Sequence, residues 1–100
     1  MDIQKILEQA VESQVSDIFL IAGLSVSFRK NGVICHEQSG KLMPADTENM
    51  ICQLYQLADN RPMETLLQTG DDDFSFSIKG LSRFRVSAFK QRGSLSVVIR

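Results

Sequence analysis

The sequence has no long apolar run and only two cysteines in its 100 residues. No apolar run approaches the ~20 residues that cross a bilayer, so we expect no membrane-spanning helix. The N-terminal segment is an acid-bearing helical pattern that does not match a secretory signal, which favours a cytoplasmic protein. Cys35 and Cys52 are too few and too far apart for a disulfide framework, and we expect both to be free and buried.

Acidic residues are absent from positions 74–100, which contain six lysines and arginines. Residues 1–73 contain twelve acids and five bases, so the net charge of the chain is only −1. This near-neutral total argues against general nucleic-acid binding, and we expect no nucleic-acid partner. The basic segment can attract an anion locally, or it can form an ordinary solvated face.

Apolar spacing predicts one helix, three strands, two helices and three strands, in that order. The expected segments are a helix over 3–11, strands over 16–22, 26–29 and 33–36, helices over 46–58 and 63–69, and strands over 74–78, 84–88 and 95–99. Asp2 and Asp46 are the expected helix caps, and Gly70 is the expected stop of the short helix. Asn31-Gly32 is a strong hairpin-turn signal. Strands joined mainly by hairpins imply an antiparallel sheet of about six strands with helices packed against it, an α+β fold.

The same patterns predict which side chains lie inside. The run over 16–22 is apolar enough to be covered on both faces. The other inward-facing residues that we expect after position 60 are Met63, Leu66, Leu67, Phe74, Phe76, Ile78, Phe84, Val86, Ala88, Leu95, Val97 and Ile99.

Arg85 and Arg100 come together if the last two strands form a hairpin with its turn at residues 92–93. That register pairs Val86 with Ile99, so apolar residues face each other throughout. It also places the two arginines opposite each other on the other face, where like charges destabilise a sheet. A phosphate between them would convert this repulsion into bidentate hydrogen bonds. The alternative is that both side chains extend separately into solvent.

Three other motifs do not indicate sites. Gly40-Lys41 lacks the earlier glycine and the following Ser/Thr of a phosphate-binding loop. Residues 71–73 are three aspartates that we interpret as a solvated turn, because consecutive side chains point in different directions. His36 beside Cys35 lacks further ligands at zinc spacing, so we predict no metal site. No nucleophile and base can be combined into a catalytic group.

Several segments resemble the N-terminal domain of the PilT-type ATPases that retract type IV pili, within the secretion-ATPase superfamily. Residues 16–24 are similar to the family's "ASDLHLSAGL" stretch, and 29–32 to its "RVDG" turn. Residues 73–76 and 83–89 resemble "DFSF…ARFRVNAF", and 97–100 resemble "AVFR". The resemblance covers essentially the whole chain.

This resemblance implies a PAS-like domain, residues 1–100, that precedes a RecA-like ATPase domain. It implies that Arg85 and Arg100 reach the phosphates of ATP when the two domains close, with Mg and ATP as cofactors of the full-length protein. It further implies a homo-hexamer, in which this domain docks on the ATPase domain of the same or a neighbouring subunit, and we expect Arg83, Phe89 and Arg92 to take part in the docking. From its position alone, Phe89 on the polar face either covers arginine side chains or belongs to a docking surface. The assembled motor would work in the cytoplasm, at the inner-membrane platform of the pilus.

The last strand continues to Arg100 without a stop signal, so we expect the chain to be a fragment with the ATPase domain following residue 100. Without a phosphate-binding loop, the fragment itself is expected not to hydrolyse ATP. The helix that begins near Met1 fits family members without a preceding domain. Two alternatives remain open, a PAS-like sensor that binds a small molecule between helix and sheet, and an adaptor that has lost its motor role.

Overall fold

The computed structural model describes residues 2–38 and 40–100. Its helices are α1 (Ile3–Glu12), α2 (Pro44–Leu57) and α3 (Glu64–Thr69), and its strands are β1 (Asp17–Leu20), β2 (Ser27–Lys30), β3 (Val33–His36), β4 (Asp71–Ile78), β5 (Ser82–Gln91) and β6 (Ser94–Ile99). The order along the chain is the predicted one. Among the described residues, no helix is both long and apolar enough to cross a membrane.

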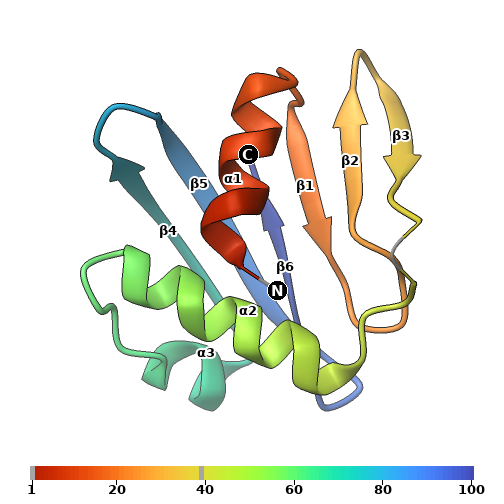
Figure 1. Ribbon diagram of the computed structural model, residues 1–100. Coiled ribbons are helices and arrows are strands. Elements are labelled where there is room, and N and C mark those ends of the chain that lie inside the picture. The colour runs from red at the N-terminus through yellow and green to blue at the C-terminus, as the bar shows by residue number, and fades with distance from the viewer. Residues whose placement is uncertain (1, 39) are drawn as a thin grey trace.

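One antiparallel sheet contains these six strands in the order β3-β2-β1-β6-β5-β4. The first and last strands lie side by side in the middle of the sheet, although they are far apart in the sequence. Figure 1 shows the helices on one side of the sheet, with α1 and α2 in front of it. The other side, which we call the open face, carries no helix in the described part of the chain. This arrangement confirms the predicted α+β, PAS-like fold.

The core lies between the helices and the sheet, and strand alternation decides which side chains enter it. On β5, Phe84, Val86 and Ala88 are buried, whereas Arg83 and Arg85 are exposed on the open face. Burial of each large apolar side chain contributes about 1.5–3 kcal/mol. The buried residues therefore hold β5 in one register and fix the direction in which its arginines point.

Two hairpin turns have the geometry that their sequences predict. Asn31 and Gly32 have φ angles of 52° and 78°, and Arg92 and Gly93 have φ angles of 54° and 79°. Positive φ at both central positions is typical of a type I′ turn, whose twist matches that of the strands. The second turn sets the register of β5 and β6.

Two of the three predicted helix boundaries are confirmed. Oδ1 of Asp2 accepts a hydrogen bond of 2.9 Å from the backbone N–H of Gln4, and Gly70 ends α3 with a φ of 89°. Asp46 is not the N-cap residue, because α2 begins at Pro44, but it caps the helix from within the first turn, where its Oδ2 accepts a hydrogen bond of 2.8 Å from the backbone N–H of Met43. Proline is favoured at the first helical position because it needs no hydrogen-bond partner for an N–H there.

Three predictions of burial are also wrong. Leu67 is 51% exposed, because it lies about 100° around the six-residue helix α3 from the buried Leu66. Cys35 is exposed, since all of β3 is exposed at the edge of the sheet. Residues 16–22 are covered by helices on one side only, so Phe19 lies half-buried on the open face. Both cysteines are free, as predicted.

Candidate functional site

The hairpin of β5 and β6 brings Arg85 and Arg100 together. Val86 pairs with Ile99, the backbone N–H of Arg85 donates to the carbonyl of Arg100 at 3.0 Å, and the N–H of Arg100 donates back to the carbonyl of Arg85 at 2.8 Å. Residues that exchange both hydrogen bonds have Cα atoms about 5.5 Å apart and side chains on the same face. The two arginines therefore lie side by side on the open face, as the register predicted.

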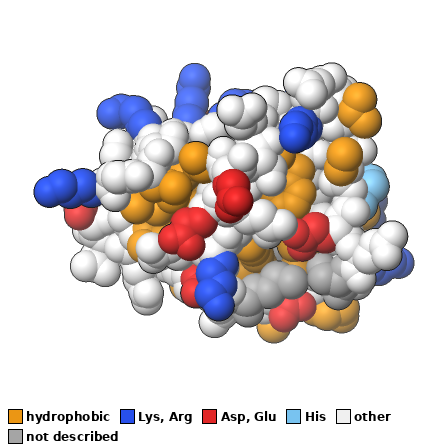
Figure 2. Space-filling view, turned by 45° about the horizontal axis from the view of Figure 1, so that its top comes forward, with side chains coloured by type: hydrophobic (Ala, Val, Ile, Leu, Met, Phe, Trp, Pro, Cys, Tyr) orange, Lys and Arg blue, Asp and Glu red, His pale blue; other side chains and the backbone are white. Residues whose placement is uncertain are grey.

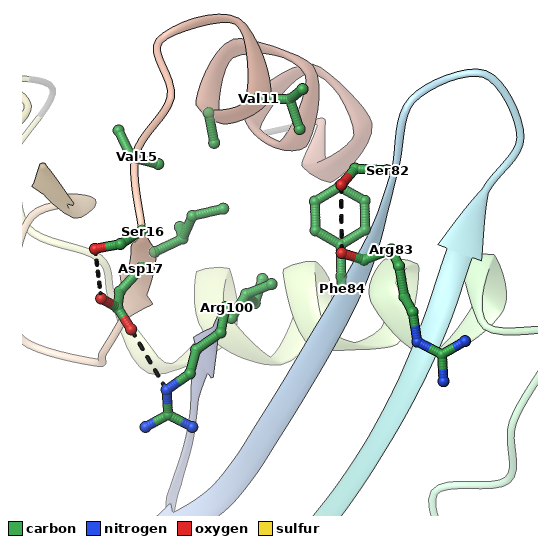
Figure 3. Close-up of a pocket in the computed structure, with 11 residues that line it drawn as sticks. Val11, Val15, Ser16, Asp17, Ser82, Arg83, Phe84 and Arg100 are labelled. Carbon is green, nitrogen blue, oxygen red and sulfur yellow. Dashed lines mark hydrogen bonds and ion pairs between the residues drawn. The ribbon is translucent and has the colours of Figure 1, made fainter.

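The two guanidinium groups have different surroundings. Within residues 2–38 and 40–100, no hydrogen bond or ion pair engages the guanidinium of Arg85. Arg100 places its Nε 3.4 Å from Oδ1 of Asp17, which lies on β1, on the opposite side of β6 from Arg85. Figure 3 shows the side chain of Arg100 extending toward Asp17 and away from β5. The backbone thus pairs the two arginines, but the guanidinium of Arg100 points toward Asp17.

Asp17 lies between two arginines. Its Oδ2 is 3.6 Å from Nη1 of Arg29 on β2, and it accepts a hydrogen bond of 2.8 Å from Oγ of Ser16. The guanidinium of Arg29 also lies over the ring of Phe19, 5.3 Å from its centroid. Four charged side chains therefore cross the open face in one row, which we call the arginine row: Arg29, Asp17, Arg100 and Arg85. Three positive charges and one negative charge leave a local excess that attracts an anion.

Arg83, Phe89 and Arg92 do not come together. Arg83 lies two residues before Arg85 on β5, and Figure 3 shows its side chain extending away from β6. Arg92 lies in the β5–β6 turn, about 30 Å from Arg83 at ~3.3 Å per strand residue. Phe89 is half-buried between them on the open face, diagonal to Val98 on β6. These residues are spread along a strand, as a docking surface would be, and do not form one compact site.

A small hollow of about 90 Å³ opens beside the arginine row. Figure 3 shows Val11 and Val15 on one side of it, with Asp17 and Arg100 on its rim. Figure 2, in which the top of the molecule is turned forward, shows basic side chains along the upper and left outline and acidic ones nearer the middle. Ligand pockets usually measure ~300 Å³ or more, so this hollow is too small to enclose a nucleotide.

Apart from the small hollow beside α1, the described residues fill the space between the helices and the sheet. Leu66 is fully buried, Phe76 and Phe84 are nearly so, and the centroids of these two rings lie 5.4 Å apart. A PAS-like sensor would hold its small molecule in this space. The filled core gives no support to the sensor alternative.

A second polar group, inside the fold, was not predicted. Asp72 is buried on β4, where its Oδ2 accepts hydrogen bonds from Oη of Tyr55 at 2.7 Å and from Nε of Arg61 at 3.0 Å. Nη2 of Arg61 donates to Oδ1 at 3.0 Å, and the guanidinium lies over the ring of Phe74, 4.6 Å from its centroid. These contacts tie the loop after α2 to the sheet. The interpretation of residues 71–73 as a solvated turn is therefore wrong, because they begin β4.

These contacts change the acidities of the groups. The hydrogen bonds from Arg61 hold the pKa of Asp72 below its ordinary value, against the opposing effect of burial. Burial, together with the hydrogen bond to Asp72, raises the pKa of Tyr55 above its ordinary value. The hydrogen bond to Asp72 likewise raises the pKa of Arg61. The group is thus a structural link between a buried carboxylate and a cation.

Potential metal ligands do not gather in the described residues, where no three side chains of His, Cys, Asp or Glu come close enough to hold an ion. His36 places its Nδ1 2.7 Å from Oγ of Ser27 on the neighbouring strand. The arginine row is therefore the group of side chains best suited to a charged ligand.

No family model matches the chain, but two curated proteins of Pseudomonas aeruginosa resemble it throughout. Its sequence is 31% identical over 100 residues to the type IV pilus ATPase PilU, and 29% identical over 100 residues to the type IV pilus retraction ATPase PilT. All of the chain is matched, but it spans only 25% of PilU and 28% of PilT. An uncharacterized protein of Escherichia coli, YggR, is 29% identical over the same span.

Solved structures agree with these relatives. The pilus retraction motor PilT with bound ADP superposes with a TM-score of 0.81 and 33% sequence identity, over 100% of this chain and 29% of that one. The ATPase DotB of Legionella pneumophila shares the fold, with a TM-score of 0.70 and 17% identity over 97% of this chain and 27% of its own. The sequence and the fold together identify the chain as an N-terminal domain of the PilT-type ATPases, as its motifs predicted.

Proposed function

We propose that the chain is the assembly and nucleotide-sensing domain of a hexameric type IV pilus retraction ATPase, and that Arg85 and Arg100 bind the phosphates of its ATP. The observation that supports this most directly is the pair of backbone hydrogen bonds between the two arginines, which sets both side chains on the open face. The guanidinium of Arg85, which no described residue engages, supports it further, because a cation without a partner is available to an anion.

The chemistry of phosphoryl transfer explains what two arginines contribute. Negative charge on the oxygens of the γ-phosphoryl group must be stabilised in the transition state, and positioned cations supply this stabilisation. Mg²⁺ bound with ATP neutralises part of the same charge. A guanidinium group can bind two phosphate oxygens at once, so it fixes the orientation of the phosphate and also neutralises part of its charge. Because the arginines lie on a separate domain, their contact also reports whether that domain has closed.

This proposal requires a RecA-like domain in the same protein, which we infer to follow residue 100. The open face would dock on it, or on that of a neighbouring subunit, through Arg83, Phe89 and Arg92. The half-buried Phe89 and Val98 support docking, since they leave apolar surface on a face that no helix of the described residues covers. The hexamer would act in the cytoplasm on the inner-membrane platform of the pilus. A coding sequence that continues without Gly-x-x-x-x-Gly-Lys-Ser/Thr within about fifty residues of Arg100 would contradict this inference.

ATP turnover tests the role of the arginines. In a chimaera in which this chain replaces the N-terminal domain of P. aeruginosa PilT, we expect Arg85→Ala and Arg100→Ala each to lower turnover about 100-fold, the usual effect of removing a donor directed at developing charge. Lys79→Ala, which removes an exposed charge at the β4–β5 turn, is the matched control and should leave turnover unchanged. Full activity of both arginine variants would instead support the adaptor alternative.

A further inference from the structure

Arg100 has a potential partner on each side of its strand. β6 lies between β1 and β5, so Asp17 lies to one side of Arg100 and Arg85 to the other. Neighbouring strands are ~4.8 Å apart, which puts β1 and β5 about 10 Å from each other. A phosphate held by both Arg85 and Arg100 would lie on the β5 side. In the structure, the guanidinium of Arg100 is on the β1 side, next to Asp17.

The contact with Asp17 is weak enough to be exchanged. It joins a single nitrogen of Arg100 to Oδ1 at 3.4 Å, whereas a strong arginine–carboxylate pair uses two nitrogens at shorter distances. The side chain of Arg100 is 55% exposed, while that of Asp17 is only 10% exposed. Asp17 is held in place by Ser16 and Arg29, so the acid is fixed and the arginine is the partner free to move.

We propose that Asp17 belongs to the anion site as the resident partner of Arg100, which a phosphate must displace before both arginines can close on it. This rests on the proposed function of Arg85 and Arg100 and adds to it a residue that opposes binding. Asp17 also lowers the repulsion between the two arginines in the free domain, since it draws one guanidinium away from the other. An anion must therefore bind the arginines strongly enough to replace Asp17. A weakly binding monovalent anion leaves Arg100 in contact with Asp17, whereas a polyphosphate draws Arg100 away from it.

The test is a titration of this chain with inorganic tripolyphosphate, followed by NMR of the arginine Nε–Hε resonances. Asp17→Asn keeps the shape and the hydrogen bond from Ser16 but removes the competing charge. We expect the dissociation constant to fall about two- to five-fold, the range for an exposed ion pair. Asp71→Asn, which removes the same charge from the same face at the far end of β4, is the control and should change it less.

A second variant gives an effect of opposite sign. Arg29→Gln leaves Arg100 as the one cationic partner of Asp17 among the described residues, so tripolyphosphate should bind more weakly than to Lys30→Gln, which removes a neighbouring charge on the other face of β2. Because Arg29 also contributes charge to the arginine row, this difference should narrow when both substitutions are made in the Asp17→Asn background. Equal effects of these two substitutions would overturn the proposal. It would also be overturned if folded Asp17→Asn, judged by its amide spectrum, bound tripolyphosphate no more tightly than the unsubstituted chain.

The outcomes separate this inference from the proposed function. If Arg85→Ala and Arg100→Ala lower turnover in the chimaera as expected but Asp17→Asn does not tighten tripolyphosphate binding, the proposed role of the arginine pair is supported and the exchange with Asp17 is refuted. If Asp17→Asn tightens tripolyphosphate binding and Arg85→Ala leaves turnover intact, the exchange at Arg100 is supported. The proposal that both arginines act on the phosphates of ATP is then refuted.

Discussion

Asp72 is held as a carboxylate by its neighbours, so the stability of the fold should depend on its charge. Its folded pKa lies below the ~3.9 of an unfolded aspartate, chiefly because of Arg61. A carboxyl group with a lowered pKa stabilises the folded state above the unfolded pKa. That contribution is lost as the pH falls through the folded pKa, because the folded state must then take up the proton as well.

We therefore expect Asp72→Asn to lower the free energy of unfolding by about 2–3 kcal/mol at pH 7, the usual cost of losing a hydrogen bond to a charged group. The difference from the unsubstituted chain should shrink as the pH falls below about 4. Urea unfolding at pH 7, 5 and 3 measures it. Asp71→Asn, at an exposed position on the same strand, should show neither effect, and a deficit independent of pH would contradict the role of the charge.

Residues 17 and 72 show why the polar contacts were harder to predict than the core. Three consecutive aspartates are typical of a turn, and only the start of β4 at Asp71 turns the middle one inward. Asp17 belongs to the motif over residues 16–24, but the motif did not predict a role for its side chain. Its contact with Arg100 depends on the pairing of β1 with β6. The sequence carries no local signal for a pairing between strands that distant.

Among the elements, α3 is the shortest helix described. Its two adjacent leucines show that an apolar pattern can predict that a helix packs on the core without predicting which of two neighbouring side chains is buried. Leu66 is fully buried and Leu67 is 51% exposed. Adjacent residues on a helix cannot share one narrow face, but over six residues the apolar pattern does not decide which of them faces inward.

Leu66→Ala should cost about 2–5 kcal/mol of unfolding free energy, because it removes buried methyl groups and leaves a cavity. Leu67→Ala should change it by less than about 0.5 kcal/mol, as expected for an exposed position away from special contacts. Chemical denaturation of the two variants side by side provides the measurement. Similar losses for both would mean that α3 is rotated relative to the position described.

The β5–β6 hairpin is the element that the sequence predicted best. Alternation of apolar residues set its register, and Gly93 after Arg92 set its turn. Both signals are local, so they did not depend on the rest of the fold. The pairing of Arg85 with Arg100 followed from that register, whereas the direction of the Arg100 side chain did not.

At the scale of the whole molecule, the sheet separates two kinds of surface. One side is covered by helices and encloses the core, and the open face carries the arginine row with the half-buried Phe19, Val98 and Phe89. The arginine row, with three positive charges and one negative charge, is a local positive excess on that face. Such an excess in a protein of near-zero net charge attracts an anion at one place without general affinity for polyanions.

The central claim is that Arg85 and Arg100 act on one phosphate group as a unit, and a double-mutant cycle tests it most directly. ATP turnover of the PilT chimaera would be measured for Arg85→Ala, Arg100→Ala and the double variant. Groups that act as a unit give strongly non-additive losses, so we predict that the double variant is no more than a few-fold slower than either single variant, each about 100-fold impaired. Losses that multiply to about 10,000-fold would show that the two arginines act independently, and would contradict the account.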